Sequence, residues 1–297
     1  MKSNDTWLNI LFSYAYIGNN KAFTDQAMSL SAEGTINCMI DSGAFTLFNS
    51  KQNLKFLTLD NYCDYIEKYG HNVEKYVMLD VIGNHSKSKL NYETMLQRGL
   101  DPMFVFTMFD NDYSYLQEAV KRNKHVCVAG GVTTKGDWIK KRYQDVYKQT
   151  QGNIHALGFV KYPQMLQLPL HSCDSSTWVQ SSQKFGHIVY FDNGLKGLNY
   201  KEVLKNKKKL TYKAQSLFES LEITPKMFSD LTNHRGSTSI AVLTNLIAYF
   251  EYQKFCKRLG LNLFLAVANR QQLNHIIKTK ELLENKLTYE KWKKELS

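Results

Sequence analysis

The sequence lacks several signatures that mark common protein classes. Its five cysteines include no CxxC pair, and its eight histidines have no HxxxH or HExxH spacing. Neither a Walker loop nor a GxGxxG motif opens a predicted helix. These absences argue against a disulfide framework, a catalytic metal, nucleoside-triphosphate chemistry and Rossmann-type dinucleotide binding. We therefore expect no metal and no cofactor, and the unpatterned cysteines favour a reducing compartment.

Long hydrophobic runs are also missing. The longest apolar stretch, 240–250, is too short to cross a bilayer and is interrupted by Thr244 and Asn245. The first residues do not have the layout of a signal peptide. The sequence therefore predicts a soluble cytoplasmic protein without a membrane partner.

The charge is unbalanced toward the positive sign. Among 297 residues, 38 are Lys or Arg and 27 are Asp or Glu, so the formal net charge is +11. Basic side chains gain binding free energy on phosphates by releasing counterions, which makes nucleic acid the first candidate partner. The alternative is a lysine-rich composition that only keeps the protein soluble. With 43% apolar residues, the chain can bury a full core.

Apolar runs alternate with helical segments along the first two thirds of the chain. Helices are expected at 59–69, 92–98, 113–122 and 136–147, and strands at 8–16, 36–40, 76–81, 103–109, 125–129, 154–160, 171–174 and 187–191. This alternation implies a parallel sheet with right-handed crossovers. Eight such units predict an α/β fold of the (β/α)8 TIM-barrel type. An open doubly wound sheet is the alternative, but it gathers its ligand loops at one switch point.

The character of the sequence changes after Asn193, where helical segments dominate. We expect residues 1–195 to form the barrel core and residues 196–297 to form a basic helical region packed on it. Five basic residues of this region could hold phosphates, although a solvated basic face is the alternative. They are Lys205, Lys207, Lys208, Lys209 and Arg235.

Three aspartates stand at the ends of three predicted strands. Asp41 opens the signature DSGAF, Asp80 ends the run YVMLD, and Asp174 lies in CDSS. A carboxylate is costly at the end of a buried strand, so its recurrence around one sheet predicts a shared active site. The structural alternatives are a capping turn for Asp41, a salt bridge for Asp80 and a helix N-cap for Asp174.

Paired carboxylates suit glycosyl transfer, because one can attack the anomeric carbon while the other manages a proton. A third can accept hydrogen bonds from N1–H and the exocyclic amine of guanine. Gly43 would let the backbone approach a ligand, and Phe45 could stack on a flat ring. Gly130 and Gly131 would offer backbone N–H groups, unless they form only a tight strand exit.

In this order, the residues resemble the queuine/archaeosine tRNA-guanine transglycosylase superfamily. The resemblance covers about residues 36–180, and it implies a (β/α)8 barrel that exchanges guanine for a 7-deazaguanine. The family's DSGG(F/Y)Q signature resembles residues 41–46, and its guanine-reading aspartate aligns with Asp80. Its Gly-Gly turn is similar to residues 130–132, its LMG strand resembles residues 156–158, and its nucleophile corresponds to Asp174.

The sequence departs from the family at three places. Ala44 and Thr46 replace the second glycine and the glutamine, and the family's CxCxxC zinc site is absent from the C-terminal region, where only Cys256 occurs. A compact, zinc-free, basic member is more similar to the DNA-guanine transglycosylases of bacteriophages and bacterial DNA-modification clusters. Those insert a 7-deazaguanine such as preQ0 into DNA, in the host cytoplasm where the enzyme is phage-encoded.

The resemblance implies a role for each matched residue. Asp174 would be the nucleophile and Asp41 the general acid/base, while Asp80 would read the guanine edge. The remaining base-pocket residues would be Ser42, Gly43, Phe45, Gly130, Gly131, Leu157 and Gly158. Three alternatives stay open, namely the same exchange in tRNA, a nucleic-acid-binding barrel without turnover, and a glycoside hydrolase using Asp41 and Asp174. The sequence also leaves open whether the protein forms a homodimer.

Overall fold

The structure is a computed structural model of the 297-residue chain. It describes residues 8–49, 54–107, 110, 112–123, 125–130, 137–159, 164–185, 187–199, 210–224, 226–227 and 238–296. The chain divides into two compact units, Met1–Ser175 with Cys256–Asn269, and Ser176–Phe255 with Arg270–Ser297. The boundary predicted from the sequence lies at residue 195. Among the described helices, none has the length and apolar character needed to span a membrane.

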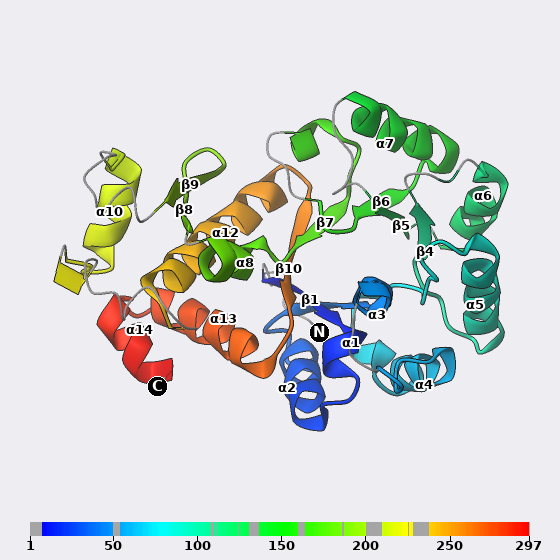
Figure 1. Ribbon diagram of the computed structural model, residues 1–297, viewed down its shortest axis with the longest axis horizontal. Helices are drawn as coiled ribbons and strands as arrows, with labels where there is room; N and C mark the ends of the chain where they lie inside the picture. The colour runs from blue at the N-terminus through cyan, green and yellow to red at the C-terminus, as the bar shows by residue number, and fades with distance from the viewer. Residues whose placement is uncertain are drawn as a thin grey trace. The chain divides into compact units, whose positions relative to one another are not determined.

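The first unit is built on an eight-stranded parallel sheet (Figure 1). In spatial order its strands are β3 (Lys75–Tyr76), β2 (Asn37–Asp41), β1 (Asn9–Ser13), β10 (Asn262–Val267), β7 (Ser172–Ser175), β6 (Asn153–Ala156), β5 (His125–Ala129) and β4 (Phe104–Thr107). Seven of these strands overlap ranges that the sequence predicts, although β3 shares only Tyr76 with the predicted strand at 76–81. The expected α/β class is confirmed.

The eighth strand differs from the prediction. The run 187–191 does form a strand, β8 (His187–Phe191), but it pairs antiparallel with β9 (Leu195–Asn199) in a separate two-stranded sheet of the second unit. Its expected place in the parallel sheet is taken by β10, which lies between β1 and β7. That part of the prediction was wrong, because local pattern does not reveal which partner a strand pairs with.

The parallel sheet curls so that its two edge strands approach each other. An isolated parallel bridge joins Val77, just after β3, to Met103, just before β4. Met78 N–H donates to Met103 O at 3.0 Å, and Met103 N–H donates to Tyr76 O at 2.9 Å. Among the described residues this contact is a bridge rather than a continuous ladder. The unit is therefore a curled half-barrel of TIM-like type, and the expected closed barrel is seen only in part.

Helices follow the strands of this sheet, most of them along its outer side (Figure 1). They are α1 (Tyr14–Ile17), α2 (Lys21–Ala32), α3 (Ala44–Asn49), α4 (Leu59–Tyr69), α5 (His85–Gln97), α6 (Tyr113–Arg122) and α7 (Asp137–Thr150), with short 3-10 turns at Gly70–Asn72 and Gln164–Gln167. Polar side chains start several of them, since Thr58 caps α4 and Asp112 caps α6.

Alternate strand residues face the helices and the inside of the curl. Phe12 packs edge-to-face on Phe23 of α2 at 5.5 Å between ring centroids, so its neighbour Ser13 points to the other face. On the edge strand β4, Phe104 likewise faces the helices and packs on Tyr92 of α5 at 5.2 Å between ring centroids. Ser13 is paired in register with Asp41, which places the Asp41 carboxylate on the inner face at the carboxyl end of β2.

The second unit is mainly helical, apart from the β8–β9 hairpin. Its helices are α8 (Thr177–Phe185), α10 (Tyr212–Ser220), most of α12 (Ile240–Arg258), α13 (Arg270–Leu283) and α14 (Tyr289–Leu296). Asn245, which interrupts the apolar run of α12, is buried and structural. Its Oδ1 accepts Val189 N–H at 2.6 Å, and its Nδ2 donates to Trp178 O at 3.1 Å.

Candidate active site

Asp41 ends β2 on the inner face of the sheet. Its Oδ2 accepts the Gly43 N–H at 3.0 Å, in the turn that leads into α3. Burial raises the pKa of Asp41 to about 6, and the negative charge of Asp174 adds to the rise, while the Ser13 hydroxyl and the Gly43 N–H oppose it. A carboxyl group with this pKa can exchange a proton near neutral pH, as a general acid or base must.

The residues that follow Asp41 are held tightly. Ser42 is fully buried, and its hydroxyl has no hydrogen-bond partner in the part of the chain that the structure describes. Gly43 has a φ of +85°, and a side-chain carbon there would lie 2.8 Å from Ala15 N. The glycine is therefore needed for packing against α1, whatever its role toward a ligand.

Asp80 follows β3 and the Val77 bridge, one strand away from Asp41. Burial raises the pKa of Asp80 to about 7, and the charge of Asp41 adds to the rise. No ion pair to Asp80 is found among the described residues, which argues against the salt-bridge interpretation. At neutral pH this carboxyl group is close to half ionised, so a ligand that donates hydrogen bonds to it would favour its ionised form.

Asp174 on β7 is the most firmly held of the three carboxylates. Its Oδ1 accepts the Gly158 N–H at 2.8 Å and lies 3.2 Å from His155 Nε2. His155 Nδ1 in turn lies 2.8 Å from Ser172 Oγ. All the interactions found for Asp174 among the described residues therefore use one oxygen, Oδ1.

A serine, a histidine and an aspartate also form the catalytic triad of many hydrolases. Ser172, His155 and Asp174 have the same residue types but a different hydrogen-bond arrangement. In such a triad the serine bonds Nε2 and the aspartate bonds Nδ1, whereas here the two nitrogens are exchanged. Ser172 is only 3% exposed, so a substrate does not reach its hydroxyl. Ser172 is thus the buried end of this chain of hydrogen bonds, and Asp174 is the carboxylate at its other end.

The charges of all three carboxylates act on one interior thiol, that of Cys127. Burial raises the pKa of Cys127, and the charges of Asp41, Asp174 and Asp80 all add to the rise. Cys127 is paired in register with His155, and His155 with Ser172, so these side chains form a row across β5, β6 and β7. The aspartates that the sequence singled out therefore meet at the carboxyl end of one sheet, where active sites of parallel α/β barrels are built.

The base-pocket residues predicted after β5 and β6 are placed in part. Gly130 directly follows β5 and has a φ of +90°, while Gly158 has a φ of +67° and donates to Asp174. Leu157 N–H donates to Val128 O at 3.1 Å, which ties the turn after β6 to β5. Gly131 lies outside the described residues, as do all five proposed phosphate-binding residues, Lys205, Lys207, Lys208, Lys209 and Arg235.

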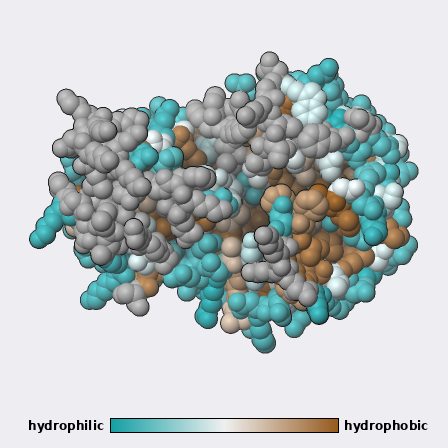
Figure 2. Space-filling view, in the orientation of Figure 1, coloured by the Kyte–Doolittle hydropathy of each residue, from teal (hydrophilic) through white to brown (hydrophobic). Residues whose placement is uncertain are grey.

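An apolar surface borders the Asp41 turn. Phe45 and Phe48, one helical turn apart on α3, are 72% and 65% exposed, and Leu47 between them is 41% exposed. Figure 2 shows hydrophobic surface gathered where α3 lies. Phe45 is thus available for stacking on a ligand, as the sequence predicts, and Phe48 extends the same surface.

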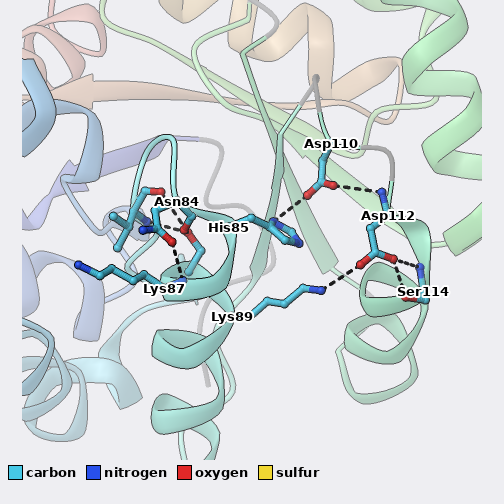
Figure 3. Close-up of polar contacts among 9 residues, drawn as sticks. Asn84, His85, Lys87, Lys89, Asp110, Asp112 and Ser114 are labelled. Atoms are coloured by element: carbon cyan, nitrogen blue, oxygen red, sulfur yellow. Dashed lines mark hydrogen bonds and ion pairs between the residues drawn. The ribbon is translucent and has the colours of Figure 1, made fainter.

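A second polar cluster, which the sequence did not indicate, lies after β3 and β4 (Figure 3). His85, the first residue of α5, places Nδ1 2.8 Å from Asp110 Oδ2. Asp110 Oδ1 accepts the Asp112 N–H at 3.1 Å, and Asp112 pairs with Lys89 at 3.0 Å. Lys87 points away from these aspartates (Figure 3). Because the predicted helix began at residue 92, His85 carried no signal in the sequence.

Within the described parts of the chain, no three His, Cys, Asp or Glu side chains are grouped as metal ligands would be. Asp41 ends β2, Asp80 follows β3 and Asp174 lies on β7. Comparison with known proteins adds nothing to this description, since no protein-family model, curated protein or solved structure matches the chain.

Proposed function

We propose that this protein is a DNA-guanine transglycosylase that exchanges guanine in DNA for a 7-deazaguanine base such as preQ0. The observation that carries the proposal is the convergence of Asp41, Asp80 and Asp174 at the carboxyl end of one curled parallel sheet. The proposal includes a complete (β/α)8 barrel, supported by the Val77–Met103 bridge between the edge strands.

In the first half of the reaction, Asp174 Oδ2 attacks C1′ of the target deoxyguanosine. The C1′–N9 bond breaks, and guanine leaves with a proton that Asp41 supplies to N9. The result is a covalent sugar ester of Asp174. The interactions of Asp174 Oδ1 with Gly158 and His155 support this assignment, because they orient the carboxylate and leave Oδ2 free of donors among the described residues.

In the second half, a 7-deazaguanine occupies the place that guanine has left. Asp41 takes the N9 proton, N9 attacks C1′, and the ester bond to Asp174 breaks. Two displacements give net retention, and no nucleoside triphosphate is needed because one glycosidic bond replaces another. The raised pKa of Asp41, about 6, supports this assignment, since the same group must release and recover one proton in each cycle.

Base recognition is assigned to Asp80 and to the exposed Phe45. An ionised carboxylate accepts hydrogen bonds from N1–H and the exocyclic amine, a pattern that guanine and 7-deazaguanines share. Phe45, 72% exposed beside the Asp41 turn, supplies a flat apolar face for the ring. The target nucleotide must leave the duplex stack to reach this site, so a flipped or single-stranded guanine is implied.

A nucleic acid is the preferred substrate, and DNA is preferred over tRNA. The net charge of +11 suits any nucleic acid. The choice of DNA rests on the absence of the CxCxxC zinc site from the C-terminal region, where the tRNA enzymes of the resembled superfamily carry structure used in tRNA binding.

A base-exchange assay tests the proposal. The protein is incubated with preQ0 and, separately, duplex DNA, single-stranded DNA and unmodified tRNA, and the digested nucleosides are identified by mass spectrometry. We expect a deazaguanine deoxynucleoside from DNA, and none with Asp174→Asn. Product in tRNA alone would keep the chemistry and overturn the substrate. Salt-sensitive DNA binding without base release would favour a non-catalytic binding barrel.

A further inference from the structure

We propose that His155 is a positioning residue for Asp174, held in one tautomer by Ser172. This inference deepens the proposed transglycosylase function and rests on it. His155 lies in the middle of β6, where its neighbours Ile154 and Ala156 are buried and apolar. The His155 side chain is only 1% exposed, so its two nitrogens depend on protein partners.

The partners of His155 define where its proton lies. An ionised carboxylate only accepts hydrogen bonds, so Nε2, 3.2 Å from Asp174 Oδ1, carries the hydrogen. In the neutral ring Nδ1 is then the acceptor, and it receives the Ser172 hydroxyl at 2.8 Å. Ser172 and Asp174 lie two residues apart on β7, so one strand supplies both partners of the ring.

The ring is also fixed by packing. Phe264 of β10 contacts His155 edge-to-face at 6.1 Å between ring centroids, and Phe264 is paired in register with Asp174. His155 is itself paired in register with Ser172. A rotation of the imidazole would therefore break two buried hydrogen bonds and one aromatic contact. Because the ring is buried, water would not replace the lost hydrogen bonds.

This arrangement has a consequence for both halves of the reaction. When Oδ2 attacks C1′, Oδ1 becomes the carbonyl oxygen of the ester and keeps its two donors, His155 Nε2–H and Gly158 N–H. When N9 of the incoming base displaces the ester, negative charge returns to the Asp174 carboxylate. The same two donors stabilise that charge and so assist breakdown of the covalent intermediate. They assist its formation by holding the Asp174 carboxylate in one orientation.

The test compares His155→Leu with His155→Gln, and uses Ser172→Ala as a third variant. Glutamine can donate from its amide nitrogen at a reach similar to that of Nε2, whereas leucine cannot donate. We expect kcat for base exchange to fall about 100-fold in His155→Leu, the scale found for loss of one preorganised donor, and at most about 10-fold in His155→Gln. KM for DNA should stay within about threefold in both.

Two further readouts separate positioning from folding. Thermal unfolding checks that each variant is folded. Mass spectrometry of the quenched protein follows the sugar adduct, which His155→Leu should form and release more slowly than His155→Gln. Equal losses in the two variants, a loss confined to KM, or unchanged kcat in a folded His155→Leu would each overturn the inference.

A measurement that needs no turnover distinguishes this inference from the proposed function. In a protein labelled with ¹⁵N-histidine, NMR should show one histidine as the Nε2–H tautomer, with its signals moved in both Asp174→Asn and Ser172→Ala. If the wild type exchanges bases but the histidine signals do not move in the two variants, only the inference about His155 is overturned. If the NMR signals are as expected but no base exchange occurs, the proposed transglycosylase function is overturned together with the catalytic use of His155. The hydrogen bond between His155 and Asp174 would then be only structural.

Discussion

The backbone nitrogen of Ala15 lies 2.8 Å from the position that a side-chain carbon on Gly43 would occupy. Helix α1 and the turn after β2 thus approach too closely for a side chain at residue 43, where the Gly43 N–H donates to Asp41 Oδ2 at 3.0 Å. The glycine of the DSGAF signature thus serves the fold and the candidate site together. A change there affects both.

Gly43→Ala should destabilise the protein by about 2 to 4 kcal/mol, the sum of a positive-φ penalty and overpacking against backbone. Urea unfolding measures the loss. Gly99→Ala is the matched control, because Gly99 has a φ of +78° but nothing within 4 Å of its missing side chain. Gly99→Ala should cost about 1 kcal/mol. Similar losses in both variants would show that the Ala15 contact is unimportant.

Stability should depend on pH through Asp41 and Asp80. Their folded pKa values, about 6 and about 7, lie above the ordinary value of 3.8. Each group therefore adds stability that is complete below pH 3.8 and is lost as pH rises through 6 and 7. Between about pH 5 and pH 8 we expect a loss of about 2 to 4 kcal/mol from the two groups together.

The measurement is urea unfolding of the wild type and of the double variant Asp41→Asn/Asp80→Asn at both pH values. The variant is the reference because burial lowers the pKa of His125 and of His275 to about 4, which changes stability in the opposite direction in both proteins. The wild type should be less stable than the variant at pH 8. A constant difference between the two proteins would contradict the burial of these carboxyl groups.

Base recognition should also depend on pH. Only the ionised Asp80 carboxylate accepts both donors of guanine, and its pKa is about 7 in the free protein. At subsaturating DNA the exchange rate should therefore rise from pH 6 to pH 8, with a midpoint near 7. Asp80→Asn should lower kcat/KM by about 100-fold, as expected for a lost charged hydrogen-bond pair, and should remove this rise. An unchanged profile would reassign Asp80.

The exposed Phe45 should contribute to substrate binding. Stacking on one base is worth about 1 to 3 kcal/mol, so Phe45→Ala should weaken binding of single-stranded DNA by about 10-fold. Fluorescence anisotropy, with Asp174→Asn in every protein to prevent turnover, measures the effect. Tyr212→Ala is the control, since Tyr212 is 80% exposed on α10 of the second unit. Equal effects of the two substitutions would mean that Phe45 has no special role.

Several elements could be read directly from local sequence. The helices α4 and α6 and the strand β5 have the predicted bounds, and the polar side chains of Thr58 and Asp112 cap the two helices. Capping side chains and short buried runs act over a few residues, which is why their signals are local. The aspartates at strand ends are also a local signal, because a carboxylate stands out after an apolar run.

The choice of strand partners was decided only by the tertiary structure. The strand at 187–191 turns back at Asn193, with a φ of 49°, and Asp192 N–H donates to Gly194 O at 2.9 Å, so it forms a hairpin. The eighth parallel strand comes instead from β10, which lies between β1 and β7 and is separated along the chain from β7 by 86 residues, 176–261. Local pattern does not encode a pairing over such a separation.

The site shows the same division between local and tertiary information. The sequence by itself determined which residues carry reactive groups, since Asp41, Asp80 and Asp174 stand out from their apolar neighbours. It did not indicate that His155 holds Asp174 or that Cys127 lies among the three carboxylates. Those relationships depend on the register of β5, β6 and β7, because only the register places one inward-facing side chain beside another.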